Sequence, residues 1–394
     1  MRILYAALDQ RVPGTTGGSV HVSAVAEGLA ALGHDVTVLA RPGPEGFPPR
    51  GKVRWHAMRP PLGVPRLRAL RGGAVRSVAA SIGAEAILER YYNFGGEGIL
   101  AARATGALAI LEVNAPVIDY PGSPKALLDR ALLVEPMRRW REWQCRAADL
   151  IVTPAAGILP ASVPHERIVE IEWGADTDRF HPGARGAVPF ERRPGSVVVV
   201  FAGAFRAWHG AAHLVRAMRV LRGRGRSDIH AVLVGTGPEL GRTRAEAAGV
   251  DGITFTGAVD HGQMPACLAA CDIGVAPFDL AAHAPLRLDF YWSPLKVFEY
   301  MAAGLPVVVP SIDRLRRIVR SGHEGLLYDA GAADALADVL TTLADSPDLR
   351  ARLGRGARDR VVRQFSWAAH CARLDGAMRQ AREWRHAAHR RCES

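Results

Sequence analysis

The sequence predicts an α/β protein with two doubly wound parallel-sheet domains that face each other across a cleft. Its 394 residues exceed one ordinary domain and are enough for two, each with a core of its own. Short apolar runs alternate with helical patterns in both halves of the chain, as in repeated βα units. Between residues 176 and 196 an irregular stretch rich in Gly, Pro and Arg indicates a linker.

The first domain is expected to span residues 1–185. Residues 2–8 have the pattern of a strand, 17–33 that of a glycine loop opening an amphipathic helix, and 34–40 that of a second strand. Further strands are expected at 84–90, 108–114 and 149–154. Because helical segments separate these strands, we expect a parallel sheet.

The pattern restarts in a second domain, expected at residues 186–365. Its strands are expected at 197–203, 229–237, 253–259, 273–278 and 306–310. A helix at 296–304 is expected to end at Gly304. The last segment, 366–394, has the pattern of one long amphipathic helix, which we expect to return towards the first domain. Parallel sheets bind ligands beyond the carboxyl ends of their strands, so two such domains predict a deep site between them.

Composition narrows the class of protein. The net charge is +11 and nearly all the basic residues are arginine. No zinc-finger spacing, aromatic RNA-binding strand or long basic run accompanies them, so we expect no nucleic acid partner. The five cysteines lack metal-ligand spacing. We find no signal-peptide pattern and no apolar run long enough to span a bilayer, and therefore expect a cytoplasmic protein.

Glycine loops follow several of the expected strands. Gly17 and Gly18 open the first helix, but they form neither a GxGxxG fingerprint nor a Walker A loop. Gly203 precedes Arg206 and His209, two residues that could meet a phosphate. Further turns follow two more strands and contain Gly235, Gly237 and Val259. A tight turn, a surface arginine or a capping histidine would explain each of them separately, whereas several on one sheet edge favour a phosphate or nucleotide site.

The stretch "SPLKVFEYMAAGLPVV" places Lys296 and Glu299 one helical turn apart. Pro294 lies near the helix start, where backbone amides and a lysine could hold a phosphate. The carboxylate of Glu299 can accept two hydrogen bonds from a vicinal diol such as ribose. The alternative is an exposed ion pair of little energetic value. Since Lys296 is one of three lysines and lies where the glycine loops converge, we favour a nucleoside-diphosphate site.

The order of motifs along the chain resembles the retaining glycosyltransferases of family 4, which have the GT-B fold. The resemblance rests on "GGSVHVSAVAEGLAALGHDVTVLA", "DLIVTPAAGI", "WGADTDRFHP", "FAGAFRAWHG", "LVGTGPE", "ITFTGAV", "ACDIGVAPF", "SPLKVFEYMAAGLPVVVP", "GLLYDAG" and "FSW". It implies a nucleotide-sugar donor held by the second domain, UDP- or GDP-linked, and an acceptor held mainly by the first. It implies no metal ion and no further cofactor.

Several residues depart from the family's pattern. The first of its two motif glutamates would fall at Tyr291, and the second is retained as Glu299, which the resemblance makes the ribose ligand. The usual basic residues would fall near Ala204 and His209, so Arg206, His209 and Lys296 are our substitutes for them. A histidine common at the end of a first-domain strand is replaced by Asn114, which can bond a sugar hydroxyl but cannot shuttle a proton.

These considerations give a set of candidate residues. The catalytic candidates are Arg206, Lys296, Glu299 and Asn114. The substrate-binding candidates are Gly17, Gly18, Gly203, His209, Gly235, Gly237, Val259, Tyr291, Ser293, Pro294, Leu295, Tyr92 and Asn93. Cations and the Gly18 amide would stabilise charge on the departing diphosphate. With no clear carboxylate nucleophile, the resemblance implies same-face attack, in which the leaving phosphate takes the acceptor's proton.

The acceptor is least defined by the sequence, and a glycan, a lipid-linked saccharide or a small molecule would each fit. Polar groups at first-domain strand ends could surround it: Glu89, Tyr91, Tyr92, Asn93, Asn114 and Asp119. The segment 58–78 mixes arginines with apolar residues and would suit peripheral contact with the inner face of a membrane, although a solvated surface is the alternative. A catalytically silent binding protein and an NAD-dependent enzyme are the rival functions, and the missing GxGxxG argues against the latter.

Overall fold

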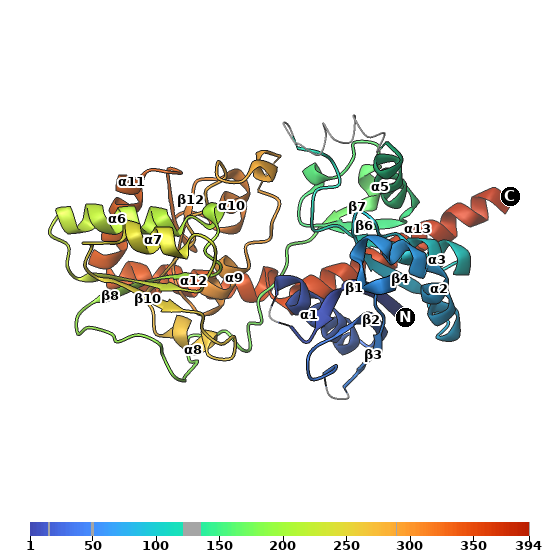
Figure 1. Cartoon of the computed structure of the whole chain (residues 1–394), viewed down its shortest axis with the longest axis horizontal. Helices are drawn as coiled ribbons and strands as arrows, with labels where there is room; N and C mark the ends of the chain where they lie inside the picture. Colours follow the sequence, from blue (N-terminus) through green and yellow to red (C-terminus); the bar gives the residue numbers. More distant parts are fainter. Residues whose placement is uncertain (15, 49–50, 121–134, 289, 394) are drawn as a thin grey trace. The chain divides into compact units, whose positions relative to one another are not determined.

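The computed structural model describes residues 1–14, 16–48, 51–120, 135–288 and 290–393. The chain forms two compact units (Figure 1). Unit 1 contains Met1–Trp173, the triplet Tyr291–Ser293 and the chain from Trp367 onward. Unit 2 contains Gly174–Phe290 and Pro294–Ser366. The sequence placed the first boundary after residue 185, and nothing in its pattern indicated that residues 291–293 would join unit 1.

Unit 1 is built on a seven-stranded parallel sheet in the order β3-β2-β1-β4-β5-β6-β7. Its strands are β1 (Arg2–Val12), β2 (Asp35–Pro42), β3 (Val53–Ala57), β4 (Ala86–Arg90), β5 (Leu108–Glu112), β6 (Leu150–Thr153) and β7 (Ile168–Glu170). Its helices are α1 (Gly17–Ala31), α2 (Gly72–Ser81), α3 (Glu97–Thr105), α5 (Glu135–Ala147) and α13 (Trp367–Glu393). The strand order reverses direction between β1 and β4, where doubly wound folds bind ligands.

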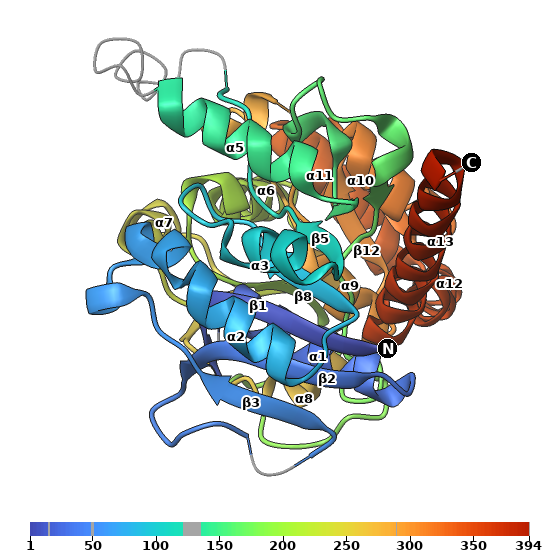
Figure 2. The same cartoon turned by 90° about the vertical axis from the view of Figure 1, so that its right-hand side faces the viewer.

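The last helix completes unit 1. Leu374 and Met378 of α13 are buried in the same core as α1 and the strands of the sheet. A side chain at Gly28 of α1 would lie 2.4 Å from the Cys371 sulfur, so the absence of one lets the two helices approach closely. Figure 2 shows α13 passing close to the N-terminus, where Arg382 pairs with Glu85 at 3.3 Å. The expected return of the C-terminal helix to the first domain is confirmed.

Unit 2 repeats the design with a six-stranded parallel sheet in the order β10-β9-β8-β11-β12-β13. Its strands are β8 (Val197–Ala202), β9 (Ile229–Val234), β10 (Ile253–Gly257), β11 (Ile273–Val275), β12 (Val307–Pro310) and β13 (Gly325–Tyr328). Its helices are α6 (Ala211–Gly223), α7 (Leu240–Glu246), α8 (Met264–Ala269), α9 (Leu295–Ala302), α10 (Asp313–Ile318), α11 (Ala333–Asp345) and α12 (Pro347–Gln364). The α/β class and both doubly wound sheets agree with the sequence prediction.

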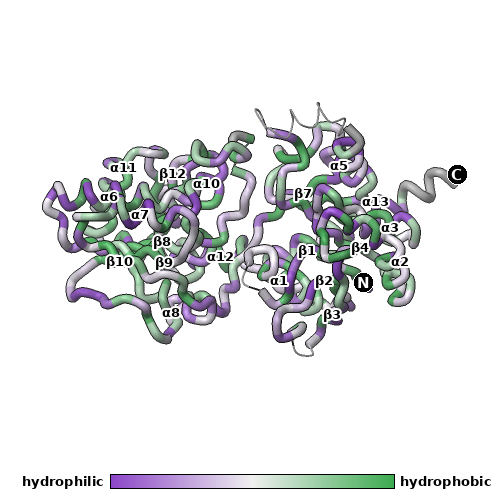
Figure 3. Tube along the Cα trace, in the orientation of Figure 1, coloured by the Kyte–Doolittle hydropathy of each residue, from purple (hydrophilic) through white to green (hydrophobic). Residues whose placement is uncertain are grey.

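Apolar residues concentrate on the strands of both sheets (Figure 3). All six residues of β8 and of β9 are buried, as expected for parallel strands covered on both faces. Among the described residues, the helices include none that is both long enough and apolar enough to cross a membrane. The free cysteines of the described chain, Cys145, Cys267, Cys271 and Cys371, are buried, as expected for thiols that fill core positions.

Candidate active site

Two glycine loops meet at the carboxyl edge of the unit 2 sheet. Gly203 follows β8 and Gly235 follows β9. A side chain at Gly235, whose φ is +127°, would lie 2.0 Å from the carbonyl oxygen of Gly203. One step further on, the Phe205 amide donates to the Thr236 carbonyl at 2.9 Å. Backbone packing between the loops therefore requires glycine here, independently of any ligand.

Lys296 lies in the first turn of α9, beside the Gly203 loop. Its Nζ is 4.2 Å from the ring centre of Phe201 and 5.3 Å from that of Phe278. Nζ is buried and has no hydrogen-bond partner among the described residues. Burial lowers the pKa of Lys296 to about 7, although the nearby Glu299 carboxylate opposes the shift. The site thus holds an ammonium group whose three donors are all available to an anion.

Glu299 lies one turn further along α9. Burial raises its pKa to about 7, against the opposing charges of Lys296 and Arg179. Lys296 Nζ is buried and makes no hydrogen bond to Glu299, so these two described residues do not form the exposed ion pair that was the alternative in the sequence. Both groups are held near neutrality by burial rather than by each other. Such groups change charge readily when a ligand arrives.

His209 and Arg206 lie in the loop after β8. The His209 ring is hydrogen-bonded through Nδ1 to the Ala204 carbonyl. Burial and the Lys296 charge lower the pKa of His209 to about 3, so the ring is neutral at ordinary pH. Its single N–H is donated to that carbonyl, so the neutral ring offers a phosphate no further donor. The low pKa therefore argues against the cationic role that the sequence prediction gave to His209. Arg206 is exposed, and its charge contributes to the low pKa of His209.

The remaining unit 2 candidates are positioned by α9 and β10. Pro294 is the residue before α9, and its carbonyl accepts from the Val297 amide at 2.8 Å. Leu295 is the first residue of the helix, so its amide belongs to the turn whose N–H groups have no partner inside a helix. Val259 follows the end of β10 and is partly exposed. The predicted contacts of Pro294, Leu295 and Val259 with a nucleotide stay predictions, and the positions of these residues are compatible with them.

Tyr291 and Ser293 lie in unit 1 and have partners there. The Ser293 hydroxyl donates to the Glu172 carboxylate at 2.8 Å and accepts from the Trp173 amide at 2.9 Å. Tyr291 is 3% exposed and packs against Trp292, with ring centres 4.9 Å apart. Burial raises its pKa to about 12, so the phenol keeps its proton. Ser293 fastens the returning triplet to residues 172–173, a structural role that the sequence prediction did not include.

Asn114 follows β5 in unit 1, and both ends of its amide are engaged. Its Nδ2 donates to the Glu112 carboxylate, and its Oδ1 accepts from the Trp173 indole at 2.9 Å. Glu112 also accepts from the Tyr5 hydroxyl at 2.5 Å and from Arg90 at 3.2 Å. A sugar hydroxyl could bond Asn114 only in addition to these contacts or in place of them.

His21 of α1 belongs to the same cluster. Its Nε2 is 3.2 Å from a Glu112 oxygen, and its ring centre is 4.4 Å from that of Trp173. Burial, with the charge of Arg90, lowers the pKa of His21 well below its ordinary value. The sequence analysis missed Tyr5, His21, Arg90 and Glu112. Polar residues in otherwise apolar strands, such as Glu112 in β5, were the available signal.

The other acceptor candidates surround the loop after β4. Glu89 accepts from the amides of Gly96 and Ile99, at 2.5 and 2.8 Å, and is fully buried. Burial and the nearby Glu97 raise its pKa to about 8. Its carboxylate therefore supports the loop from beneath. Tyr92 and Asn93 lie on the loop and are partly exposed. Asp119 is engaged by Arg138 at 2.9 Å.

Gly17 and Gly18 begin α1, beyond the carboxyl end of β1. Thr16 caps this helix by accepting from the Ser19 amide at 3.3 Å. A side chain at Gly18 would lie 2.2 Å from the Gln10 side-chain oxygen, so the glycine keeps the loop close to β1. The described residues contain no group of three or more His, Cys, Asp and Glu side chains arranged to hold a metal ion.

Residues 15–179 match the family described as Glycosyltransferase Family 4, and residues 196–346 match the one described as Glycosyl transferases group 1. The chain belongs to the group 1 glycosyltransferases. Two solved structures, the first titled a glycosyltransferase, share its GT-B fold. One from Rickettsia africae has a TM-score of 0.70, with 15% identity over 96% of this chain and 98% of that one. Anabaena HepE in complex with UDP has a TM-score of 0.67, with 17% identity over 96% of this chain and all of that one (100%).

Curated relatives of this glycosyltransferase vary in how much of their length they share with it. D-inositol 3-phosphate glycosyltransferase of Corynebacterium glutamicum is 29% identical over 229 residues, 55% of this chain and 52% of that protein. Phosphatidyl-myo-inositol mannosyltransferase of Mycobacterium leprae is 33% identical over 149 residues, 37% of each chain. The chain thus spans about half or less of these two. MMP alpha-(1->4)-mannosyltransferase of Mycolicibacterium hassiacum is 26% identical over 408 residues, 90% of this chain and 92% of that protein.

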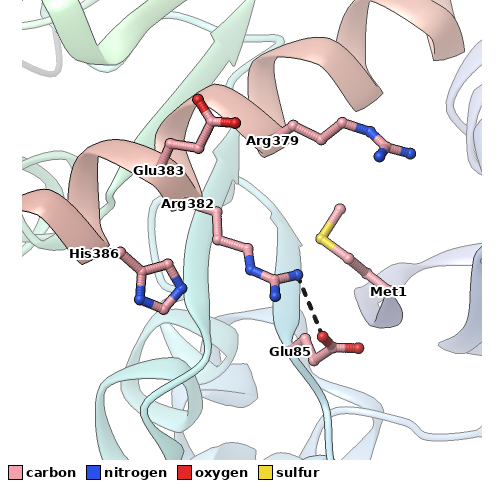
Figure 4. A pocket seen from close by; sticks show the side chains of 6 residues that line it. All are labelled: Met1, Glu85, Arg379, Arg382, Glu383 and His386. Atoms are coloured by element: carbon pink, nitrogen blue, oxygen red, sulfur yellow. Dashed lines mark hydrogen bonds and ion pairs between the residues drawn. The ribbon is translucent and has the colours of Figure 1, made fainter.

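One pocket of this glycosyltransferase lies away from all these candidates. Met1, Glu85, Arg379, Arg382, Glu383 and His386 line it (Figure 4). Met1 and Glu85 directly precede β1 and β4, so the pocket lies at the amino edge of the unit 1 sheet. Parallel sheets bind ligands at the opposite edge. The mutual pairing of Arg382 and Glu85 also leaves less of the pocket's charge for a ligand.

Proposed function

We propose that the protein transfers a sugar from a nucleoside-diphosphate sugar to a hydroxyl group of an acceptor, with retention and without a metal ion. The single observation that carries this proposal is Lys296. Its ammonium group is buried without a hydrogen-bond partner among the described residues, beside the Gly203 loop and one turn before Glu299. A buried unpaired cation is costly unless an anion completes its environment. A diphosphate is such an anion.

The roles follow from the chemistry of each group. Lys296, the first-turn amides of α9 and the exposed Arg206 would hold the diphosphate, since each is a donor or a cation. Glu299 would accept hydrogen bonds from the ribose diol when ionised. His209, neutral at ordinary pH, donates its one N–H to the Ala204 carbonyl and would not donate to the diphosphate. In unit 1, the loop with Tyr92 and Asn93 is our candidate for contacting the acceptor.

The reaction we propose breaks the bond between the anomeric carbon and the diphosphate oxygen. Negative charge develops on the departing diphosphate, and Lys296 and Arg206 stabilise it. The acceptor hydroxyl attacks the same face of the sugar, and its proton goes to the leaving phosphate oxygen. We propose that these cations supply the charge that a metal ion provides in other transferases. A product with inverted anomeric configuration, read by NMR, would contradict the retaining mechanism.

UDP and GDP are the donor nucleotides that we propose. HepE of Anabaena is described in complex with UDP and with UDP-glucose. A Mycobacterium tuberculosis relative, 30% identical over 212 residues, is named as a GDP-mannose-dependent mannosyltransferase. These names support the two nucleotides without choosing between them. For the acceptor we propose a sugar, polyol or lipid-linked hydroxyl, in line with the inositol phosphate and phosphatidylinositol compounds in the relatives' names.

The test of donor binding is a thermal-shift screen with UDP, GDP, ADP, TDP and NAD. One nucleoside diphosphate should raise the melting temperature by mass action, by an amount that grows with its concentration. Lys296→Met removes the charge at similar length, and Glu299→Gln removes the carboxylate charge. Both should weaken that shift, whereas Arg242→Gln, which changes an 81% exposed side chain of α7, should not. A shift with NAD instead, or with none of the five, would contradict the donor site.

The second candidate function is binding of a nucleotide sugar without transfer of the sugar. Tyr291, buried and un-ionised where the family has a glutamate, favours it. The matching nucleotide sugar would then bind without release of nucleoside diphosphate in any acceptor mixture. Release of nucleoside diphosphate that requires an added acceptor would exclude this second function.

A further inference from the structure

Residues 58–78 lie in a part of unit 1 that has an unusual balance of charge. No Asp or Glu occurs between Glu45 and Glu85. The same interval contains the basic residues Arg50, Lys52, Arg54, Arg59, Arg66, Arg68, Arg71 and Arg76. Arg59 and Arg66, within the segment, are exposed. The surface formed here therefore favours an anionic partner.

The same segment exposes large apolar side chains. Leu62 is 93% exposed, Leu70 is 73% exposed and Val64 is 40% exposed. Leu62 lies in the short turn Pro61–Gly63, Leu70 lies in the short turn Pro65–Arg71, and Val64 joins the two turns, which precede α2 (Figure 2, the blue turns before that helix). The described residues include eight exposed large apolar side chains, and three of them fall between residues 62 and 70. Such clustering marks an interaction surface, whereas single exposed leucines are ordinary.

Leu62 also has an unfavourable backbone conformation. Its φ is +53°, which makes it a non-glycine residue in the left-handed region. Leucine is disfavoured there, and asparagine or glycine would fit with less strain. With its side chain almost wholly in solvent, Leu62 gains nothing in the fold that offsets this cost. An apolar side chain in that position therefore requires a reason outside the fold.

A buried arginine holds the segment in place. Arg68 is fully buried and donates to Asp9 at 2.8 Å, to Glu97 at 2.6 Å and to the Arg90 carbonyl at 3.0 Å. Asp9 lies near the end of β1 and Arg90 ends β4, so Arg68 ties the turn to the carboxyl edge of the unit 1 sheet. Leu70 and Arg66, two residues to either side, remain exposed. The exposed apolar surface is thus attached to a rigid support at the edge where the acceptor candidates lie.

We propose that residues 59–71, the docking segment, bind the surface of an anionic lipid bilayer. Leu62, Val64 and Leu70 enter the boundary between headgroups and acyl chains, while Arg59 and Arg66 contact lipid phosphates. Nucleic acid would satisfy the charge but not the exposed aliphatic side chains, and residues 59–71 contain no aromatic side chain on which the bases of a single strand could stack. The proposal does not depend on sugar transfer. If both hold, the surface brings a lipid-borne acceptor to the edge that carries Asn93.

The experiment is co-sedimentation of the full chain with phosphatidylcholine vesicles, with and without phosphatidylglycerol, at low and physiological salt. We expect binding to the anionic vesicles only, weakened by salt because the arginine contacts are screened. Leu62→Asn should reduce binding about tenfold, as expected for removing one buried leucine from the bilayer boundary. Because asparagine tolerates the left-handed region, the same variant should keep or raise the melting temperature. Arg66→Glu should reduce binding by at least about fivefold.

Matched controls lie in unit 2. Val362→Gln changes a 42% exposed apolar residue, and Arg242→Glu changes an 81% exposed arginine, and neither should alter vesicle binding. The proposal is overturned if wild type fails to sediment with anionic vesicles at low salt. It is also overturned if Leu62→Asn binds them as wild type does, or if an RNA homopolymer displaces the protein from vesicles and binds wild type and Leu62→Asn equally.

Discussion

At the scale of single residues, the site depends on how burial sets charge. Lys296 and Glu299 have pKa values of about 7, lowered and raised by desolvation, and His209 is held neutral. From the sequence alone, Lys296 and His209 would be taken as cations and Glu299 as an anion. In the structure all three are therefore near or at neutrality when no ligand is bound. In the proposed function, a diphosphate could therefore bind without first separating a strong ion pair.

Donor binding should consequently depend on pH. Above pH 7 Lys296 is mostly neutral, so binding a diphosphate to its charged form must take up a proton. Affinity should fall roughly tenfold per pH unit above pH 7, since one proton is linked to binding. His209, with a pKa of about 3, does not titrate there.

Titration calorimetry in two buffers of different ionisation enthalpy measures this proton directly. Lys296→Met should bind more weakly at pH 7 and show no further loss as the pH rises to 9. If the variant lost affinity with the wild-type slope, the linked proton would belong to another group.

Lys296 and Glu299 could be predicted from the sequence because they lie one turn apart in a single helix. Ser293 could not, since its partner Glu172 is 121 residues away in the chain. The Glu112 cluster was missed for the same reason: Tyr5, His21, Arg90 and Asn114 come from β1, α1, β4 and the end of β5. Contacts between such elements are set by tertiary packing, which local spacing does not encode.

At the scale of elements, the loops after β8 and β9 are built by backbone packing. Gly203 and Gly235 were predicted as ligand contacts, and the structure gives a second reason for glycine at both. Gly235 faces the Gly203 carbonyl, and a side chain on Gly203 would lie 3.0 Å from the Lys296 ammonium nitrogen. A change in either loop would therefore move Lys296 as well as the backbone.

Gly235→Ala should lower stability by about 2–4 kcal/mol, because its φ of +127° disfavours a side chain and its Cβ would overlap the Gly203 carbonyl. Gly241→Ala in α7 is the control: nothing lies within 4 Å of the added carbon, and alanine suits a helix. Urea unfolding measures both. Equal stability of the two variants would show that the loops can separate without cost.

At the scale of the whole molecule, unit 1 is completed by chain from distant parts of the sequence. The α/β class, the two parallel sheets and the returning helix were readable from periodicity, because βα units repeat on both sides of the linker. The triplet 291–293 was not, since three residues carry no periodic signal. Unit 1 therefore depends on one segment that interrupts unit 2 in the chain and on another that follows it.

Met378→Ala should lower the stability of unit 1 by about 2–5 kcal/mol, since the side chain is fully buried in its core. Hydrogen exchange read by mass spectrometry should show faster exchange in α1 and β6, with β8 and β9 unchanged. Met218→Ala, in the unit 2 core, should give the reverse pattern. Faster exchange spread over both units in either variant would mean that they unfold together.

The late position of α13 also bears on synthesis. A chain emerging from the ribosome usually folds its first domain first. Here the residues that form unit 2 are all outside before α13 appears, so unit 2 can fold while the face of unit 1 that receives Leu374 and Met378 is still bare. Unit 1 therefore begins before unit 2 and is completed after it. Until α13 has emerged, the nascent protein presents an uncovered apolar surface that a chaperone could recognise.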